Sequence, residues 1–507
     1  MKKHRLSVGL MSALIGTLMA FDTAGAVHLS NNGIGQALVY PYYTVNGHQQ
    51  TLLSVVNTSN AAKAVKVRFR EGYNGRSVME FDLFLSPFDV WTATVFAIDD
   101  AGVPSIYGSG AGILTRDRSC VSPAFGDDQT TLPDGTPYAR FRNFAYLVPD
   151  DGGPYTIDRT REGHFEVIAM ADLSGALAAA VTHGSTGSPT NCAAVGNLVA
   201  GQAGINPPSS GLFGSAGIID VQRGVYFGYD ADALERFTAT ALYSDTAQAG
   251  YPDLGAVNDG AGALASQATA LVVMPDGGRL STYPGADPRS RRIDAVSAVF
   301  AAENVYNEYQ TSAALAANTD WVFTFPTKAY YVDEQLIGGP AVAIPPFVRI
   351  YDGSFGASCV TLERRLYDRE EKVANDNPSF GGVPPPATPP PKLCHETSVL
   401  SFLNVPTGTF PTSSGVLGSN LVTNSRPSVG AAGWMRLGFD PTVEPHALLA
   451  SSNGNVFRGL PVTGFAAISI TNNQATTING VSTLANYSST TKHRPTSKCV
   501  NGDGGCE

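Results

Sequence analysis

The chain has 507 residues, a formal net charge of −10 and only 15% charged residues, and it contains 54 Gly and 33 Pro. An apolar share of 43% is too high for a disordered chain, and the composition lacks the Ala, Glu, Lys and Leu bias of a coiled coil. The negative charge, without a basic cluster beyond residue 5, predicts that the protein does not bind nucleic acid.

The first residues have the pattern of a secretory signal peptide. Residues 2–5 read Lys-Lys-His-Arg, residues 6–21 are uncharged and mostly apolar, and Ala24-Gly25-Ala26 fits the small-x-small rule for cleavage. The apolar run is shorter than the roughly 20 residues that a membrane-spanning helix needs. We therefore predict that residues 1–26 are a cleaved leader and that the mature chain has no transmembrane segment.

Short runs rich in β-branched and aromatic residues follow at 51–57, 64–70, 78–85 and 90–95. Turn-forming residues, among them an Asn-Gly pair, separate these runs, as expected for strands joined by hairpins. Apolar and basic side chains alternate along residues 64–70, which predicts a strand with one buried face and one face in water.

Comparable runs recur through most of the chain. We predict a mainly β fold, with one or two antiparallel β-sandwich domains of immunoglobulin-like type, long loop insertions and one short amphipathic helix. A turn-rich stretch at 184–215 is either a linker between two sandwiches or a long loop within one. We place the boundary there, between a sandwich domain at 27–205 and a second one at 206–478. Residues 479–507 are polar and aperiodic, which predicts a C-terminal tail.

Two features are expected inside the second domain. Apolar residues near 293–309 recur mostly at spacings of three and four, which predicts an amphipathic helix packed on a sheet. Residues 383–391 are rich in Pro and cannot join the interior of a sheet, so we expect a loop there.

Cysteine usage agrees with export to an oxidising compartment. Six cysteines follow the leader and none forms a C-x-x-C pair, so we expect disulfides between nearest neighbours in the chain. Six cysteines allow 15 connectivities, and the sequence alone does not choose among them. The cysteines are Cys120, Cys192, Cys359, Cys394, Cys499 and Cys506.

One constellation of ionisable residues could carry chemistry. Glu162, His164 and Glu166 alternate along a predicted strand, so their side chains share a face and could hold a cation or exchange a proton. The same face continues with Ile168 and Met170, which favours a strand that runs from the rim into the core. The common hydrolase, nucleotide-binding and zinc motifs are absent from the sequence, so we predict no cofactor and no catalysis.

A row of aromatic residues is the second candidate. Trp321, Phe323 and Phe325 would lie on one face of a strand. An exposed row would form a platform on which sugar rings stack, whereas a buried row would be part of a sandwich core. We favour a buried row, because large aromatic residues dominate the cores of β-sandwiches.

Two resemblances add to these predictions. The segment LLSVVNTSNAAKAVKVRFREGYNGRSVMEFDLFLSPFDVW, at 52–91, resembles the first strands of an immunoglobulin-like sandwich. The segments EGHFEVIAMADL, NEYQTSAALAANTDWVFTFPTK and GLPVTGFAA resemble a family of exported proteobacterial proteins of the cell-surface type whose function is uncharacterised. The second resemblance implies a Gram-negative source and no particular catalytic residues.

Three functional hypotheses follow. The first is an exported, disulfide-stabilised structural or interaction protein of the periplasm, the cell surface or the extracellular space, whose partners are other surface proteins, further copies of itself or a polysaccharide. The second is a secreted carbohydrate-binding or carbohydrate-active protein that uses the aromatic row. The third is an outer-membrane β-barrel, which is disfavoured because many of the predicted strands are shorter than about ten residues.

Overall fold

The computed structural model describes residues 25–101, 109–126, 130–196, 198–199, 201–243, 251–258, 267–285, 291–337, 342–352, 358–375, 392–403, 411–425, 427, 429–472, 485–502 and 504–506. Residues 1–24 of the predicted leader and the predicted Pro-rich loop at 383–391 lie outside the described residues. Among the described residues, no helix is both long enough and apolar enough to cross a membrane.

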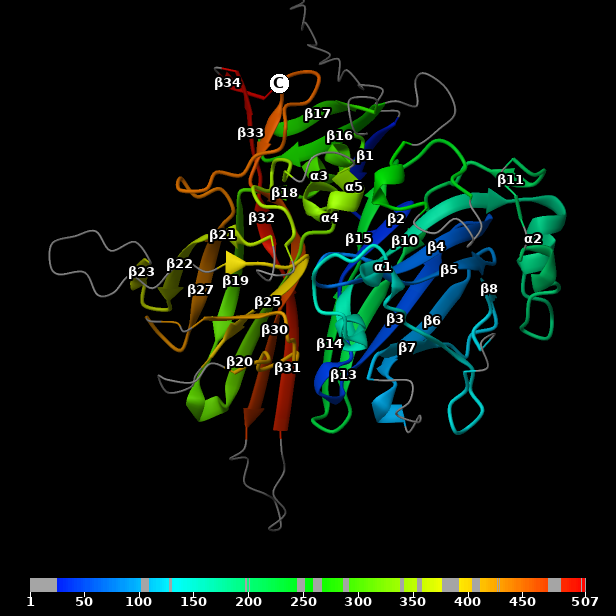
Figure 1. Ribbon diagram of the computed structural model, residues 1–507, viewed down its shortest axis with the longest axis horizontal. Coiled ribbons are helices and arrows are strands. Elements are labelled where there is room, and N and C mark those ends of the chain that lie inside the picture. Colours follow the sequence, from blue (N-terminus) through cyan, green and yellow to red (C-terminus); the bar gives the residue numbers. More distant parts are fainter. Residues whose placement is uncertain are drawn as a thin grey trace, which may run out of the picture.

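The chain forms two β-sandwiches that lie side by side (Figure 1). The large sheet of the first sandwich has the strand order β17-β16-β1-β15-β2-β10-β4-β5-β8, and β11 pairs with β10. Its strands are β1 (Ala26–Leu29), β2 (Ala37–Thr44), β4 (Ala62–Glu71), β5 (Ser77–Leu85), β8 (Cys120–Ser122), β10 (Glu162–Leu173), β11 (Ile205–Asn206), β15 (Asp232–Glu235), β16 (Gln267–Met274) and β17 (Gly277–Pro284).

A second sheet covers one face of this large sheet. It has the order β14-β13-β3-β6-β7-β9, and β12 pairs with β3. Alternate side chains of both sheets, among them Phe165 and Val167 from β10 and Trp91 and Val95 from β6, meet in one apolar core. The strands are β3 (Gln50–Asn57), β6 (Val90–Ala97), β7 (Ala111–Leu114), β9 (Tyr138–Arg140), β12 (Leu212–Phe213), β13 (Ser215–Asp220) and β14 (Val225–Asp230).

Two five-stranded sheets make the second sandwich, and side chains such as Leu437 and Leu400 meet between them. The first sheet has the order β23 (Val373–Asn375), β22 (Glu363–Asp368), β27 (Ala432–Gly438), β19 (Asn304–Gln310) and β32 (Arg494–Thr496). The other has the order β26 (Val422–Ser425), β25 (Thr397–Phe402), β20 (Ala317–Thr324), β30 (Thr463–Asn472) and β31 (Ala485–Lys492).

Small sheets and short helices complete the described structure. The small sheets pair β18 (Ala301–Ala302) with β29 (Leu460–Pro461), β21 (Val360–Thr361) with β24 (Lys392–Leu393), and β33 (Lys498–Asn501) with β28 (Val456–Arg458) and β34 (Gly504–Gly505). The helices are α1 (Phe144–Leu147), α2 (Gly175–Val181), α3 (Ile293–Phe300), α4 (Ala329–Val332) and α5 (Glu334–Ile337). Described strand pairs are antiparallel except β1 with β16 and β25 with β26, so the predicted mainly β sandwich class is confirmed.

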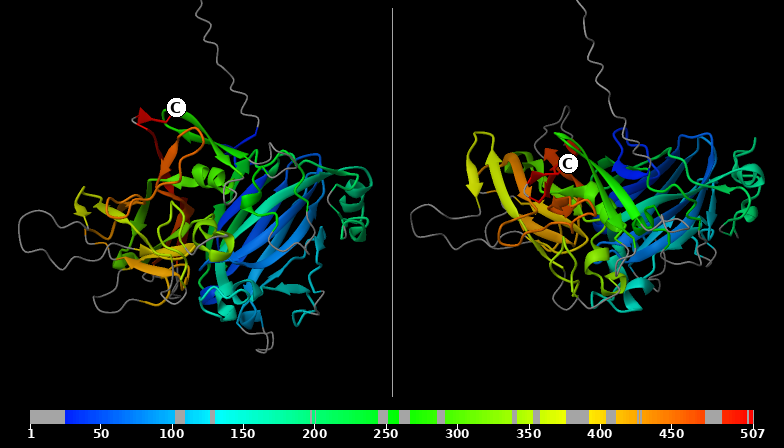
Figure 2. Two further views of the ribbon diagram at one scale, coloured as in Figure 1. Left: turned by 45° about the horizontal axis from the view of Figure 1, so that its top comes forward. Right: turned by 90° about the horizontal axis from the view of Figure 1, so that it is seen from above.

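The two sandwiches share apolar cores. The outer face of the β20 sheet packs on the first sandwich, where Phe465 stacks on Tyr229 at 4.7 Å between ring centroids. Helix α3 contacts β1 and β16 on one side and β29 on the other. The two halves remain side by side in both views of Figure 2.

Side chains of β31 join the edge of β14. Ser488 Oγ donates to the Tyr226 carbonyl at 2.9 Å and accepts from the Tyr226 amide at 3.3 Å. Thr490 Oγ1 donates to the Gly228 carbonyl, and Asn486 Nδ2 donates to the Arg223 carbonyl at 2.8 Å. We call these contacts the side-chain seam, because no backbone ladder pairs the two described strands.

The predicted domain limits differ from the sheets observed. Strands β13 to β17, which follow residue 205, complete the first sandwich, so the division lies between β17 and α3. The turn-rich segment near 205 is therefore a loop within one sandwich. The predicted tail at 479–507 supplies β31, β32, β33 and β34 to three sheets, because its polar run includes Tyr and Thr residues, which suit a strand as well as a loop.

The helix is shorter than the predicted 293–309, and it has no solvent-exposed face. It ends at Phe300, and the following β19 pairs with both β27 and β32. All eight helical residues are buried. The two polar residues can be buried because their side chains are hydrogen-bonded to Tyr331 Oη, Asp294 at 2.8 Å and Ser297 at 2.7 Å. The buried apolar residues Val305 and Tyr309 lie four positions apart, a spacing that fits one face of a strand as well as one face of a helix, which explains the error.

The basic face of β4 is also buried, in contrast to the predicted wet face. Lys66, Arg68 and Arg70 are at most 6% exposed. Arg68 donates to the Pro252 carbonyl at 2.8 Å, and Arg70 lies 3.7 Å from Asp253, so the segment 251–258 covers this face. Pairing with carboxylates makes this burial possible, since an unpaired buried charge is costly.

Three disulfides connect nearest neighbours along the chain, as predicted. They join Cys120 to Cys192, Cys359 to Cys394 and Cys499 to Cys506. A cross-link of this kind limits the conformations of the unfolded chain, and the longest described loop closes over a separation of 72 residues. The protein is therefore stabilised by disulfides in both sandwiches.

Candidate functional site

Glu162, His164 and Glu166 share one face of β10, as the alternation predicts, but this face is inside the protein. Their exposed fractions are 4%, 0% and 1%, while Phe165 and Val167 face the sandwich core on the opposite side. The three side chains turn to different partners. Among the described residues, no group of three or more His, Cys, Asp or Glu is arranged to hold a metal ion.

Glu162 joins the two sandwiches through four hydrogen bonds. Tyr42 Oη (2.9 Å) and Asn46 Nδ2 (3.1 Å) donate from the first sandwich. Ser419 Oγ (2.6 Å) and the Asn420 amide (2.9 Å) donate from the second. Burial raises the pKa of Glu162, and its donors oppose that effect. The geometry makes this carboxyl a structural link.

Glu166 is held by arginines of the neighbouring strand β4. Its Oε1 accepts from Arg68 Nη1 at 3.2 Å and from Arg70 Nη2 at 3.1 Å. Its Oε2 is buried without a hydrogen-bond partner. Charge-assisted hydrogen bonds of this kind compensate the burial of a carboxylate. Glu166 is therefore a buried partner of the two arginines of β4 and is not open to a ligand.

His164 faces Glu396, which comes from the loop before β25. The distance from Nε2 to Oε1 is 3.6 Å, and neither side chain has a hydrogen-bond partner. Burial raises the pKa of Glu396 to about 8 and lowers the pKa of His164 to about 3. At neutral pH both groups are therefore mainly uncharged, which is how low-dielectric surroundings accommodate them.

A third buried charged group surrounds Arg159. Its Nε donates to Glu71 Oε2 at 2.7 Å and its Nη1 to Asp151 Oδ1 at 2.8 Å. The guanidinium also lies 4.3 Å from the ring centre of Tyr146. The members of this group are separated by up to 88 residues and no short motif connects them, so the sequence did not predict it.

The predicted aromatic row is part of the core. Trp321, Phe323 and Phe325 are each 0% exposed, and Trp321 Nε1 donates to the Glu308 carbonyl at 2.9 Å. Rings of the row pack against Phe402 and Phe439. The row is therefore not a sugar-stacking platform in this structure, and the interpretation as a sandwich core holds.

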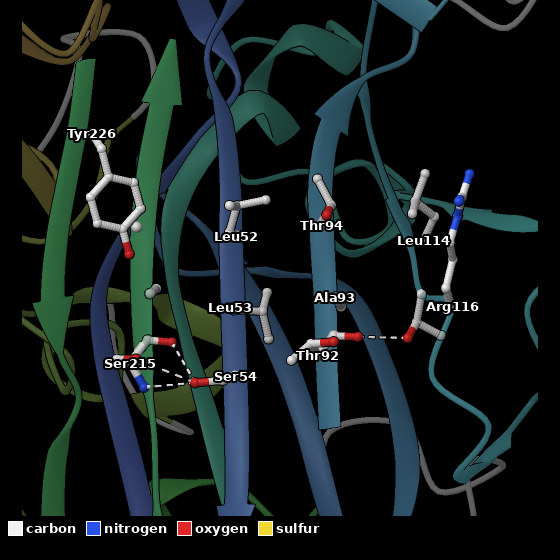
Figure 3. Close-up of a pocket in the computed structure, with 13 residues that line it drawn as sticks. Leu52, Leu53, Ser54, Thr92, Ala93, Thr94, Leu114, Arg116, Ser215 and Tyr226 are labelled. Carbon is white, nitrogen blue, oxygen red and sulfur yellow. Dashed lines mark hydrogen bonds between the residues drawn. The ribbon is translucent and has the colours of Figure 1, made fainter. Parts of the chain in front are cut away.

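The open face of the seven-stranded sheet carries a groove of about 470 Å³ (Figure 3). We call it the sheet-face groove. Its lining residues come from β3, β6, β13, β14 and the end of β7. They are Leu52, Leu53, Ser54, Thr92, Ala93, Thr94, Leu114, Thr115, Arg116, Ser215, Ala216, Gly217 and Tyr226.

Tyr226 is the aromatic residue of the groove. Its side chain is 53% exposed and lies on strands β13 and β14, directly over two glycines. A Cβ atom at Gly217 would come within 2.2 Å of the ring, and one at Gly228 within 2.9 Å. These two glycines are paired in the β13–β14 ladder, and because neither has a side chain, the ring packs directly on the backbone.

Hydroxyl groups and apolar side chains alternate along the rest of the groove. Ser54 Oγ lies 3.3 Å from Ser215 Oγ, and Thr115 Oγ1 donates to the Thr92 carbonyl at 2.6 Å. Figure 3 shows Tyr226, Leu52 and Thr94 on separate strands of the sheet. Arg116 is the one charged residue among the lining residues, all of which are described.

The sequence carried a weak signal for this groove. Residues 225–230 read Val-Tyr-Phe-Gly-Tyr-Asp, which is typical of a strand, but the sequence alone does not tell which face of the strand meets the solvent. The glycines at 217 and 228 become informative only when the register of β13 and β14 places them opposite each other. Comparison of the chain with protein-family models, with curated proteins and with solved structures finds no match.

Proposed function

We propose that this chain is an exported interaction protein of the cell surface or extracellular space, and that it binds a polysaccharide in the sheet-face groove. The observation that carries the proposal is the exposed ring of Tyr226 lying flat on Gly217 and Gly228. An aromatic face held flat beside hydroxyl groups offers a sugar both a stacking surface and hydrogen-bond partners.

The shape of the groove favours binding along a chain of sugars. It runs across neighbouring strands of an open sheet, and its lining alternates Leu52 and Leu114 with Ser and Thr side chains. A pyranose ring has the same alternation, with C–H groups on its faces and hydroxyls at its edge. Arg116 pairs with the exposed Asp134 only at 3.6 Å, so its positive charge would still favour an acidic sugar at that end.

The groove supports binding more than glycoside hydrolysis. Hydrolysis in most glycosidases needs two carboxyl groups on opposite sides of the scissile bond. None of the lining residues, each of which is described, is Asp or Glu. The carboxyls predicted as candidates, Glu162 and Glu166, are buried elsewhere in the protein.

Two variants test the groove. Tyr226→Ala removes the ring. Gly217→Ala keeps the ring but places a methyl group in the space where it packs, and Ala can adopt the backbone conformation of Gly217. We expect each variant to bind at least about tenfold more weakly, which corresponds to about 1.4 kcal/mol. Affinity electrophoresis in gels containing dextran, as a neutral probe, or polygalacturonate, as an acidic probe, measures this loss.

The control variant is Tyr155→Ala, which removes an equally exposed tyrosine outside the groove. Its mobility in the polysaccharide gels is expected to match that of the wild type. If neither polysaccharide retards the wild type, or if Tyr226→Ala and Gly217→Ala are retarded as strongly as the control, the proposal is wrong.

Export is a separate part of the proposal. It is supported by the leader pattern at 1–26, by the three disulfides and by the resemblance of three segments to exported cell-surface proteins. N-terminal sequencing of the protein from fractionated Gram-negative cells is expected to begin at Val27, in material outside the inner membrane. An uncleaved chain in the cytoplasm would contradict export and leave the binding test unaffected.

A further inference from the structure

A buried lysine and a buried aspartate face each other across two neighbouring strands of the large sheet. Lys66 of β4 lies directly opposite Asp82 of β5 in the antiparallel ladder. Side chains at directly opposed positions leave the same face of a sheet close together. Lys66 Nζ lies 2.6 Å from Asp82 Oδ1, and each side chain is 1% exposed. The register therefore holds an amine and a carboxyl group in contact, away from water.

Apolar residues surround this pair on the same face of the sheet. Ala64 and Phe84 form a neighbouring opposed pair of the β4–β5 ladder, and Ile168 of β10 lies opposite Lys66 on its other side. All three apolar residues are 0% exposed. Separated charges are costly in such surroundings, so the transfer of one proton from the ammonium to the carboxylate is easier here than in water.

A second buried lysine on the same strand provides a comparison. Lys63 Nζ donates to Asp172 Oδ1 at 2.7 Å and to the carbonyl and the hydroxyl of Ser209, both at 2.8 Å. Three acceptors satisfy the three N–H donors of an ammonium. Lys66 Nζ is equally close to a carboxylate, but this contact lacks hydrogen-bond geometry and the buried nitrogen has no hydrogen-bond partner. Lys66 therefore lacks the acceptors that hold Lys63 as an ammonium.

We propose that Lys66 and Asp82 condense to form an isopeptide bond between β4 and β5. A proton first passes from the Nζ ammonium to the carboxylate, which gives an amine and a carboxylic acid. The amine nitrogen then attacks Cγ, so that the Nζ–Cγ bond forms and the bond from Cγ to the hydroxyl oxygen breaks. The leaving hydroxyl takes one proton from the nitrogen, and one water molecule departs. Neither group is oxidised or reduced, and no co-reactant is needed.

Position and the exclusion of water both favour this condensation. Groups held in contact by a rigid framework react as though they were present at very high concentration. Arg68 occupies the next position on this face of β4, and its positive charge can stabilise the oxyanion that develops as the amine attacks. The buried surroundings keep bulk water from the finished amide, which protects it against hydrolysis.

Mass spectrometry of the reduced and denatured protein tests the proposal. We expect a mass one water molecule lower than the mass calculated for the chain from its sequenced N-terminus. Trypsin should release residues 64–68 joined to residues 77–116, because the amide blocks cleavage after Lys66 and connects the two fragments. In the same digest, cleavage after Lys63 should be normal and the fragment that contains Asp172 should be unattached.

Two variants identify the residue that condenses. Lys66→Arg keeps a cation beside Asp82 but has no amine that can form the amide, so it should have the full calculated mass. The control Lys498→Arg replaces a lysine whose side chain is 54% exposed, and it should still lack one water molecule.

The wild type decides the outcome without any variant. A full calculated mass with residues 64–68 and 77–116 released separately would overturn the proposal. Loss of water that maps to other residues, or that persists in Lys66→Arg, would overturn it as well. A bond between Lys63 and Asp172 would contradict the role given to the missing hydrogen bonds of Lys66.

Discussion

The Glu396→Gln variant is expected to gain stability over the wild type as the pH rises. The difference in free energy of unfolding, variant minus wild type, should be roughly 3 to 5 kcal/mol larger above pH 8 than at pH 4. The carboxyl is buried, its oxygens have no hydrogen-bond donors, and burial raises its pKa to about 8. Gln keeps the shape of the uncharged carboxyl and does not titrate.

The direction of this effect follows from proton binding. Below the ordinary pKa of 4.5, the folded and unfolded chains both hold the proton at Glu396. Between 4.5 and about 8 the unfolded chain has lost it while the folded chain retains it, so each pH unit lowers the free energy of unfolding by about 1.4 kcal/mol. Above pH 8 the loss is complete. The buried histidines are common to both proteins, whereas the pKa of Lys328, which burial lowers and the Glu396 charge raises, is lower in Glu396→Gln.

Urea unfolding of the wild type and Glu396→Gln, at intervals from pH 4 to pH 9, measures the difference. The exposed Glu334→Gln serves as the control, since its side chain already contacts water in the folded protein. A stability difference between wild type and Glu396→Gln that stays constant over the whole range would show that Glu396 does not hold its proton in the folded state.

Arg159→Met is expected to lower the free energy of unfolding by about 3 to 5 kcal/mol at pH 7. Arg159 is 3% exposed and binds both Glu71 and Asp151. Met preserves much of the side-chain volume, so the loss comes mainly from two carboxylates left without their cation. The ring of Tyr146 also loses its contact with the guanidinium.

A double-mutant cycle identifies the cause of this loss. Adding Glu71→Gln to Arg159→Met removes one of the stranded charges, so urea unfolding should show that the double variant recovers a large part of the lost stability. Arg223→Met breaks the partly exposed pair with Asp220 and is expected to cost at most about 1 kcal/mol. Equal losses for Arg159→Met and Arg223→Met would contradict the proposed role of burial.

Local sequence patterns were sufficient for the fold class and for the disulfides. Alternation along β4 and β10 predicted strands, and neighbouring cysteines in the chain are the ones joined. The pattern of β4 did not show that Arg68 and Arg70 would be covered, because the covering residues Pro252 and Asp253 lie more than 180 positions away. A charged face of a strand is predicted to be exposed to solvent unless its distant partners are known.

The candidate sites show the same limit. Glu162, His164 and Glu166 were correctly placed on one face, yet their partners Ser419 and Glu396 come from the other sandwich and make the face structural. The sheet-face groove depends on register instead. Gly217 and Gly228 are unremarkable in the sequence, and only their pairing across two strands leaves room for the ring of Tyr226.

The side-chain seam between β14 and β31 has a consequence for inherited variation. A backbone ladder tolerates most substitutions, because nearly every residue supplies the same N–H and C=O groups. The seam relies instead on the particular side chains of Asn486, Ser488 and Thr490. Single substitutions there can loosen the attachment of one sandwich to the other while each retains its own fold, so the mutual orientation of the sandwiches can drift in evolution faster than either architecture.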